Sequence, residues 1–303
     1  MSLQFFADGV IAGAMIALGA SGVTLTYSIL RFANFAQGEF VSWGGYFALS
    51  LAGWIGSLAA SAIEPLEPLS VGWSVLLALL VAMPLTGLLA WLLDVALFAR
   101  LRRRGAAIAL VMASFGASMA LRALLEVVYS TRPAYFSREL QIAVPVGHGI
   151  RVTPDQIALL VTTAVLVAGL HLMLAYTRTG RSMRAVSESP ELARVIGIDV
   201  ARIIRITWFV GGGLACAAGV LLGLVVQLRP AMGFDLLLPM FAAAILGGIG
   251  SVPGALAGGL IIGIAEALAV QFVGAEWRAG VAFAVLVLVL LIRPTGLAGR
   301  MAG

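Results

Sequence analysis

Lysine is absent from this chain of 303 residues, and charge of either sign is scarce. All 19 basic residues are arginines, and charged residues make up 11% of the sequence, whereas soluble domains carry about 25%. The phosphate-binding loop GxxxxGK[ST] requires a lysine, so the chain does not hydrolyse ATP by that route. A retinal or pyridoxal Schiff base also requires a lysine amine, which excludes rhodopsins and pyridoxal enzymes.

Cysteine and histidine are almost as rare. The single cysteine, Cys216, cannot form an internal disulfide, and its apolar neighbours indicate a small packing residue. His171 stands alone in an apolar run, and no second His, Cys or acid follows at metal-ligand spacing, so we predict no metal site and no cofactor. The sequence contains no GxSxG nucleophile motif.

Apolar residues are abundant, at 61% of the chain. A helix needs about 20 apolar residues to cross a bilayer. Runs of this kind cover residues 5–29, 40–60, 71–98, 105–128, 155–177, 204–228, 236–250, 254–273 and 279–292. The seventh and ninth runs are short. We therefore predict an all-α polytopic membrane protein with about 8–10 transmembrane helices, in a single domain spanning residues 1–303.

Arginine placement predicts the orientation, because cytoplasmic loops are enriched in basic residues. Four arginines lie in the gap 100–104 and six in the gap 178–205, whereas the gap 61–70 contains Glu64 and Glu67 and no arginine. Alternation through the predicted spans places the N-terminus in the periplasm and the C-terminus in the cytoplasm. Arginines confined to short gaps between apolar runs indicate membrane topology and not nucleic-acid binding. The N-terminus lacks a basic segment, so we expect no cleaved signal peptide.

The first polar feature is RFANFAQGE, residues 31–39, between the first two runs. Polar groups at membrane depth are costly unless they line a cavity or find partners. One interpretation is a turn at the cytoplasmic interface, and the other is a re-entrant or broken segment beside a translocation path. The candidate path residues here are Asn34, Gln37, Gly38 and Glu39.

The second feature is a short amphipathic helix within the loop 178–205. Ser189 suits the N-cap, Pro190 the first helical position, and Gly197 the position after the helix. The apolar side chains at helical spacing are Leu192, Val195 and Ile196. A partner protein would cover this apolar face, although a helix lying on the bilayer surface is the alternative. The predicted segment comprises Ser189, Pro190, Glu191, Leu192, Ala193, Arg194, Val195, Ile196 and Gly197.

The third feature is LGGIGSVPGALAGGLIIG, residues 246–263, where glycines and a proline interrupt an apolar run. Such a break forms either a discontinuous helix at a substrate site or a tight turn between closely packed helices. Glu266 follows in the next run and should face the bundle interior, hydrogen-bonded or protonated. The candidate path residues here are Gly247, Gly248, Gly250, Ser251, Gly254 and Glu266.

Other patterns predict helix packing. Small residues every four positions allow helix backbones to approach closely. They occur as Gly9, Gly13 and Ala17 in the first run and as Gly211, Ala215, Gly219 and Gly223 in the sixth. Arg122 and Glu126, spaced i,i+4, predict a mutual ion pair.

These features, in this order, resemble the permease subunit of branched-chain amino acid ABC importers. The resemblance covers nearly the whole chain. The matching stretches are TLTYSILRFANFAQGEFVSWGGY (24–46), RAVSESPELARVIGIDVARI (184–203), LGGIGSVPGALAGGLIIGIAE (246–266) and RPTGL (293–297). The middle stretch is also similar to the cytoplasmic loop motif of ABC importers, with Glu191, Ala193 and Gly197 at its positions.

The resemblance implies a transport mechanism that depends on several partners. A periplasmic binding protein would deliver substrate, and two permease subunits, more often different chains than identical ones, would form the path between them. Two cytoplasmic ATPases would drive transport, each seated on a coupling helix such as residues 189–197. The chain itself would be embedded in lipid and would not be an enzyme.

Two other classes are possible from the residues alone. A secondary transporter or channel for small polar solutes would need coupling acids at the membrane midplane and an internal repeat, and only Glu266 is a clear candidate. A membrane-embedded enzyme would need clustered His, Asp or Glu, and the histidines are far apart.

Overall fold

The computed structural model describes residues 3–58, 67–70, 72–102, 105, 107–137, 141–147, 150–272, 274–292 and 296–297. The helices are α1 (Leu3–Leu30), α2 (Gln37–Leu58), α3 (Trp73–Leu93), α4 (Ala99–Arg102), α5 (Ala107–Tyr129), α6 (Pro154–Tyr176), α7 (Arg178–Glu188), α8 (Pro190–Val195), α9 (Val200–Val225), α10 (Met232–Gly247), α11 (Val252–Phe272) and α12 (Arg278–Ile292). A π-helical turn, Asp94–Phe98, joins α3 to α4, and a 3₁₀ turn, Ala275–Trp277, precedes α12. The strands β1 (Val144–Gly147) and β2 (Ile150–Val152) form an antiparallel hairpin.

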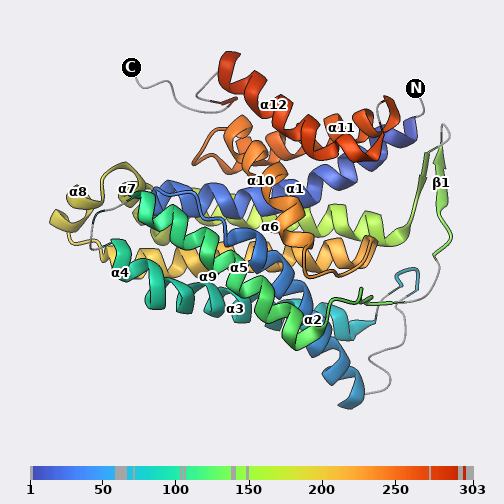
Figure 1. The fold of residues 1–303 in the computed structure, drawn as a ribbon, viewed down its shortest axis with the longest axis horizontal. Helices are drawn as coiled ribbons and strands as arrows, with labels where there is room; N and C mark the ends of the chain where they lie inside the picture. Colours follow the sequence, from blue (N-terminus) through green and yellow to red (C-terminus); the bar gives the residue numbers. More distant parts are fainter. Residues whose placement is uncertain are drawn as a thin grey trace.

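Every predicted apolar run forms a helix, so the all-α polytopic prediction is confirmed (Figure 1). Six helices are long and apolar enough to cross a membrane, namely α1, α3 with its extension to Arg102, α5, α6, α9 and α11. The helices α10 and α12 are apolar but shorter, with 16 and 15 residues, as the short seventh and ninth runs predicted. The chain is a multi-pass membrane protein.

Two helices form the centre of the bundle. In the most apolar stretch of α1, 89% of residues are buried, and in α9 the share is 72%. The corresponding stretches of α3 and α5 are 33% buried, and that of α6 is 22% buried. The peripheral helices therefore expose apolar surface that lipid can cover, while α1 and α9 are surrounded by protein.

Small residues allow these helices to pack closely, as the four-residue spacing predicted. A Cβ on Gly13 would lie 2.8 Å from the Cα of Leu260 in α11, and a Cβ on Gly263 would lie 2.3 Å from the Cα of Gly13. In α9, a Cβ on Gly219 would lie 2.0 Å from the carbonyl oxygen of Val41. The backbones of α1 and α11, and of α2 and α9, are therefore in direct contact.

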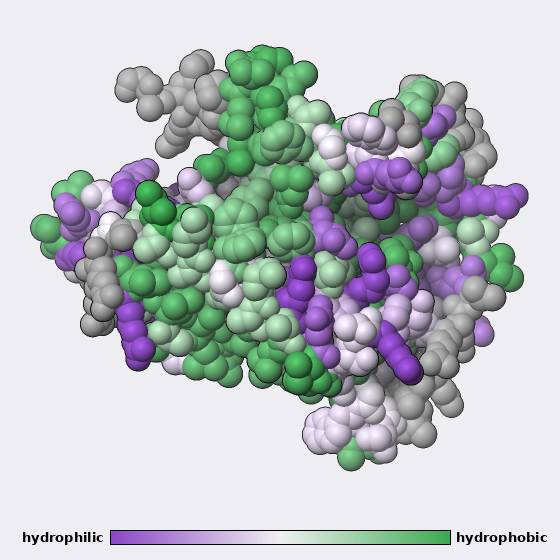
Figure 2. Space-filling model, in the orientation of Figure 1, coloured by the Kyte–Doolittle hydropathy of each residue, from purple (hydrophilic) through white to green (hydrophobic). Residues whose placement is uncertain are grey.

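The bundle has two distinct ends. At the hairpin end, Gln4 near the start of α1 accepts a hydrogen bond from the backbone N–H of Arg151 in β2 at 2.8 Å. The α8 end contains α4, α7 and α8, and α1 ends there (Figure 1). Figure 2 shows apolar side chains over much of the bundle between these ends and hydrophilic ones around α7–α8 and toward the hairpin. This distribution fits a bilayer whose normal runs from the hairpin end to the α8 end.

Some residues used for the orientation and family predictions lie outside the described part of the chain. These are Glu64, Arg103, Arg104, Arg138, Arg293, Pro294, Thr295, Arg300 and the C-terminus. Within the RPTGL stretch, Leu297 is described, and its backbone N–H donates to the carbonyl of Leu246 at 2.7 Å. This bond holds the chain after α12 against the last turn of α10.

Candidate translocation and coupling sites

The connection between α1 and α2, residues 31–36, turns back into the bundle instead of crossing its surface. We call these residues the re-entrant segment. Phe32, Asn34 and Ala36 are buried, and α2 begins at Gln37 with its first residues fully inside the protein. Asn34 helps to start the helix, because its Oδ1 accepts from the N–H of Ala36 and its carbonyl accepts from the N–H of Gln37. The segment therefore runs into the bundle, as in the re-entrant interpretation of residues 31–39, and its position beside a translocation path stays a prediction.

Hydrogen bonds place the start of α2 near the middle of the bundle. Gln37 Nε2 donates to the carbonyl of Gly211 at 3.2 Å, and Gly211 lies about 16 Å along α9 from its first residue. The N–H of Phe35 donates to Ser114 Oγ, seven residues into α5. Gln37 Oε1 and Asn34 Nδ2 are buried and have no hydrogen-bond partner among the described residues. These two atoms can still bond to a ligand or to water.

A charged pair lies beside this helix start. Glu39 is fully buried, and its Oε1 lies 3.6 Å from Arg122 Nε and accepts a hydrogen bond from Ser118 Oγ at 3.3 Å. The Arg122 guanidinium also lies over the ring of Phe234, 4.4 Å from its centroid. The predicted ion pair of Arg122 with Glu126 is wrong, since among the described residues Arg122 pairs with Glu39. Helical spacing cannot reveal a partner on another helix.

The start of α10 meets the start of α2 at the same depth. A Cβ on Gly38 would lie 2.5 Å from the carbonyl oxygen of Gly233, so the first turns of the two helices touch through glycines. Ser42 Oγ accepts from the N–H of Gly233 at 3.0 Å and donates to the carbonyl of Pro230 at 2.9 Å. Helix N-termini carry partial positive charge, and discontinuous membrane helices use such ends to bind anionic groups. Two of them converge on the mid-bundle site, which we define as Asn34, Gln37, Gly38, Glu39, Ser118, Arg122 and Phe234.

The glycine-rich segment lies on a different face of α1 from Gln37 but at a similar depth, because a Cβ on Gly22 would lie 2.9 Å from Gln37 Nε2 and Gly250 bonds to Thr24, two residues further along α1. The helix α10 ends at Gly247, residues 248–251 form a turn, and α11 begins at Val252, so the run is broken where the sequence predicted. Gly248 and Gly250 have φ values of 93° and 91°, which only glycine adopts readily. The N–H of Gly250 donates to Thr24 Oγ1 at 2.7 Å, and Ser251 Oγ accepts from the N–H of Gly254. The break is a tight turn between two packed helices, fastened to α1.

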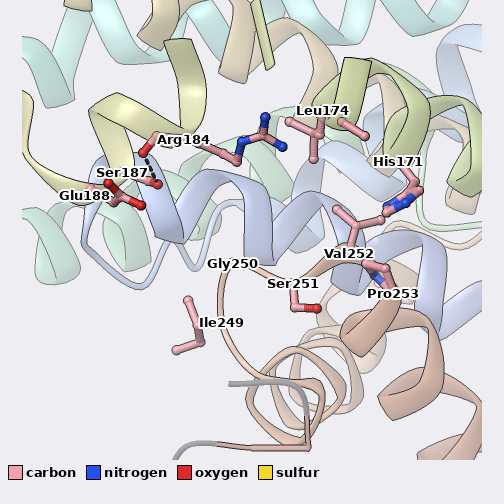
Figure 3. A pocket seen from close by; sticks show the side chains of 11 residues that line it. His171, Leu174, Arg184, Ser187, Glu188, Ile249, Gly250, Ser251, Val252 and Pro253 are labelled. Carbon is pink, nitrogen blue, oxygen red and sulfur yellow. Dashed lines mark hydrogen bonds between the residues drawn. The ribbon is translucent and has the colours of Figure 1, made fainter. Parts of the chain in front are cut away.

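A cavity of about 590 Å³ opens between this turn and the end of α7. Figure 3 shows Arg184, Ser187 and Glu188 on one side of it and Ile249, Gly250 and Ser251 on the other. His171 and Leu174 of α6 complete the wall. The cavity is polar on the α7 side, and it separates the glycine-rich turn from the segment that carries α8.

Glu266 is buried, as predicted, but it lies far along α11 toward the hairpin end. Near it, Gly9 at the start of α1 packs against Gly263 and Ala267. The Oε1 atom of Glu266 has no hydrogen-bond partner among the described residues. The predicted path residues therefore occupy three separate places, which are the mid-bundle site, the turn after α10 and the part of α11 near the hairpin end.

The predicted amphipathic helix is present as α8. Ser189 is its N-cap and accepts from the N–H of Leu192 at 3.3 Å, Pro190 opens it, and Gly197 follows it with φ of 84°. Ala193 is buried against the bundle, while Leu192, Val195 and Ile196 are 67%, 83% and 71% exposed. The apolar face of α8 is therefore exposed, and its covering by a partner protein or by the bilayer surface stays a prediction.

Two features of these sites were not predicted from the sequence. The first is α7, whose signal was Thr177 as N-cap with Met183 and Val186 at i,i+3, both now buried. The second is Arg31, whose guanidinium Nη2 donates to the carbonyls of Ser187 and Glu188, and no local pattern predicts that contact. Among the described residues, no group of three or more His, Cys, Asp or Glu is placed to hold a metal ion.

Comparisons with known proteins agree with this architecture. Residues 5–290 match the family described as "branched-chain amino acid transport system / permease component". The chain is 34% identical to the high-affinity branched-chain amino acid transport system permease protein LivH of Escherichia coli, with 98% of this chain and 96% of that protein covered. It is 32% identical to BraD of Pseudomonas aeruginosa, over 98% and 96%, respectively. It is 31% identical to a probable LivH of Methanocaldococcus jannaschii, over 94% and 89%.

Among solved structures, PsaBC from Streptococcus pneumoniae in complex with Fab aligns over 97% of this chain and 95% of that chain. The sequence identity is 14% and the TM-score is 0.49.

Proposed function

The chain belongs to the branched-chain amino acid transport permease family, and we propose that it forms half of the translocation path of an ABC importer for branched-chain or related amino acids. The relatives LivH and BraD are named as permeases of branched-chain amino acid transport systems. The chain performs no covalent chemistry in this proposal. ATP hydrolysis takes place on separate subunits, in keeping with the absence of the lysine that a phosphate-binding loop requires.

The observation that carries the proposal is the exposed apolar face of α8. Leu192, Val195 and Ile196 extend from an arginine-rich end of the bundle, while Ala193 fixes the helix to it. We propose that α8 is the coupling helix, with Ser189 to Gly197 seated in a cleft of an ATPase subunit. A surface-lying amphipathic helix would insert the same side chains into lipid headgroups, so the two arrangements predict different partners.

The mid-bundle site is the proposed part of the path in this chain. Buried polar groups at membrane depth are costly and are typical of substrate pathways. Here the unpartnered atoms of Asn34 and Gln37, the ion pair of Glu39 and Arg122, and two helix N-termini converge. A zwitterionic amino acid has both a carboxylate and an ammonium group, so a site with donors and acceptors side by side matches its chemistry.

The remaining parts of the transporter complete this proposal. A second, homologous permease chain forms the other half of the path, a periplasmic binding protein delivers the substrate to the hairpin end, and two ATPases dock at the α8 end. The complex lies in the inner membrane, with the N-terminus in the periplasm and the C-terminus in the cytoplasm. The arginines of α4 and α7 support this orientation, because they gather at the α8 end.

Purification of the chain from its native membrane in mild detergent tests the class. We expect two ATPase chains and a second permease to co-purify, and the ligand of the associated binding protein then identifies the substrate. The alternative, a secondary transporter or channel, predicts that the chain transports without ATP and without an ATPase partner. Uptake that persists after ATP depletion would contradict the ABC assignment.

Cysteine accessibility tests the path. In a Cys216→Ala background, we expect Asn34→Cys, Gln37→Cys and Ser251→Cys to react with polar thiol reagents to an extent that changes between nucleotide-free and ATP-bound transporter. Gly116→Cys, on the outer surface of α5 with no atom near it, is the control expected to stay constant. Equal protection of all three positions in both nucleotide states would show that these residues serve helix packing and do not line the path.

A further inference from the structure

The side chain of Arg31 fastens the end of α7 to the start of the re-entrant segment. Its Nη2 donates to the carbonyl of Glu188 at 2.9 Å and to that of Ser187 at 3.1 Å. These are the last two residues of α7, and the carbonyls at a helix C-terminus carry partial negative charge. A guanidinium that binds two such carbonyls forms a charge-assisted contact between segments 156 and 157 residues apart in sequence.

The backbone of Arg31 is held in an unusual conformation. Its φ is 57°, and Ser130 is the other non-glycine residue with positive φ in the described part of the chain. The left-handed conformation is unfavourable for a residue with a Cβ, so it persists where the surroundings fix it. Glycine would end α1 here without strain, which indicates that the guanidinium contributes something that glycine would lose.

Both ends of this contact lead to functional segments. On one side, Ser189 is at once the C-cap of α7 and the N-cap of α8, so the bonded carbonyls lie directly before the coupling helix. On the other side, Arg31 is the first residue of the re-entrant segment, and Gln37 and Glu39 of the mid-bundle site follow within eight positions. The end of α7, Arg31 and the re-entrant segment therefore connect α8 to the start of α2 by a short chain of residues.

The surroundings leave space beside this connection. The cavity of about 590 Å³ lies between the end of α7 and the turn after α10, with Ser187 and Glu188 on its wall (Figure 3). The turn itself is bonded to α1 through Gly250 and Thr24. The cavity thus leaves unfilled space on one side of the end of α7, while the bond to Arg31 joins that end to the re-entrant segment.

We propose that Arg31 is the positioning residue that transmits the movement of α8 to the mid-bundle site, so that ATPase closure changes the conformation of the re-entrant segment. The inference rests on the proposed function, because it requires α8 to dock on an ATPase. Arg31 touches neither substrate nor nucleotide in this mechanism. Its loss should separate ATP hydrolysis from transport and should not abolish either assembly or hydrolysis.

The test measures ATP hydrolysed per substrate molecule imported, in proteoliposomes containing the complete transporter with its binding protein. Arg31→Gly is the most informative variant, because glycine adopts a positive φ without strain and the substitution therefore removes only the side chain. We expect transport to fall about tenfold, the range of a typical coupling energy, with ATPase activity within about twofold of wild type. Arg31→Lys keeps a charge with fewer donors and should be intermediate.

Arg181→Gln is the matched control. Arg181 also lies on α7 and is exposed, but its side chain has no hydrogen bond or ion pair among the described residues, so its ratio should equal that of wild type. A second readout is labelling of Ala33→Cys, in a Cys216→Ala background. Its reactivity should depend on nucleotide with Arg31 present and lose that dependence in Arg31→Gly.

The outcomes are distinguishable. Two results would overturn the transmission by Arg31 and leave the proposed function intact. The first is an unchanged ratio of ATP hydrolysed to substrate imported in Arg31→Gly. The second is a fall of transport and hydrolysis together, in proportion to the amount of assembled complex. Absence of an ATPase from the purified wild-type transporter would instead overturn the proposed function, and the inference with it. A raised ratio together with lost nucleotide dependence at Ala33 supports the inference.

Discussion

Glu39 of α2 and Arg122 of α5 form an ion pair near the middle of the bundle, with Oε1 and Nε 3.6 Å apart. The Glu39 side chain is fully buried, and that of Arg122 is 21% exposed. Glu39 Oε2 and Arg122 Nη2 remain without hydrogen-bond partners among the described residues. The pair neutralises its charges but leaves hydrogen-bonding capacity free, and a structural pair would be expected to use that capacity.

Neutralising one partner at a time separates structural from transport effects. Glu39→Gln or Arg122→Gln should each destabilise the chain by about 3–5 kcal/mol, because the remaining charge loses its partner. The double variant should recover most of that stability, since no unpaired charge remains. Uptake should stay low in all three if the charged groups bind substrate. The measurements are thermal unfolding in detergent and uptake in proteoliposomes.

Arg132→Gln provides the control for this series, because Arg132 is exposed and has no side-chain partner among the described residues. Its stability and uptake should match wild type. Recovery of uptake in the Glu39→Gln, Arg122→Gln double variant would mean that the pair is purely structural, and the mid-bundle site would lose its main support.

Gly197 should be essential for the geometry of α8. Its φ of 84° ends the helix and directs the chain into α9, and a valine there would strain the backbone by roughly 1–2 kcal/mol. We expect Gly197→Val and a bulky replacement of Glu191 to lower transport and substrate-stimulated ATPase activity, while membrane insertion is retained. Both activities are measured in proteoliposomes, with insertion checked by protease protection.

Gly169→Val is the matched control for Gly197, because Gly169 lies in α6 with no atom within 4 Å of a new Cβ and no positive φ. It should transport normally. Normal ATP-driven uptake by Gly197→Val or the Glu191 variant would show that α8 does not take part in coupling.

Two glycine-to-alanine substitutions should act with opposite signs on stability. The new Cβ of Gly263→Ala would lie 2.3 Å from the Cα of Gly13, so α1 and α11 must separate, at a cost of about 1–3 kcal/mol. Gly169→Ala meets no atom and should stabilise α6 by up to about 1 kcal/mol through helix propensity. Thermal unfolding of the purified chain measures both, and an unaffected Gly263→Ala would contradict the contact between α1 and α11.

Thiol labelling of intact cells tests the orientation. With Cys216 replaced by alanine, Arg181→Cys on α7 and Thr131→Cys after α5 lie at opposite ends of the bundle, and both positions are exposed. A membrane-impermeant reagent added outside should label Thr131→Cys and spare Arg181→Cys until the membrane is opened. The reverse pattern would invert the proposed topology.

Local features were predictable because adjacent residues encode them. Hydropathy located every spanning helix, although α9 begins at Val200, earlier than the apolar run at 204, since Asp199 caps it through the N–H of Arg202. Capping and periodicity located α8 from Ser189 to Gly197. The spacing of Gly9 and Gly13 identified a packing face. Each of these signals lies within a few residues of the feature it predicts.

The arrangement of the candidate sites was not predictable in the same way. The sequence predicts that Asn34 and Glu39 line a path, but their depth follows from the bonds of neighbouring Phe35 and Gln37 to Ser114 and Gly211, on helices far away in sequence. Glu266 was grouped with them from its chemistry, and the antiparallel packing of α1 and α11 puts it nearer the hairpin end. A single sequence carries no direct signal for such long-range contacts.

The sequence by itself determined that this is a lysine-free, all-α membrane protein with a capped amphipathic helix, because helix length, hydropathy and caps are local properties. Only the tertiary structure decided that Arg122 pairs with Glu39 and not with Glu126, and that Arg31 holds the end of α7. The physical reason is that buried charges and carbonyls are satisfied by whatever groups helix packing brings within a few ångströms, and that packing depends on the whole chain.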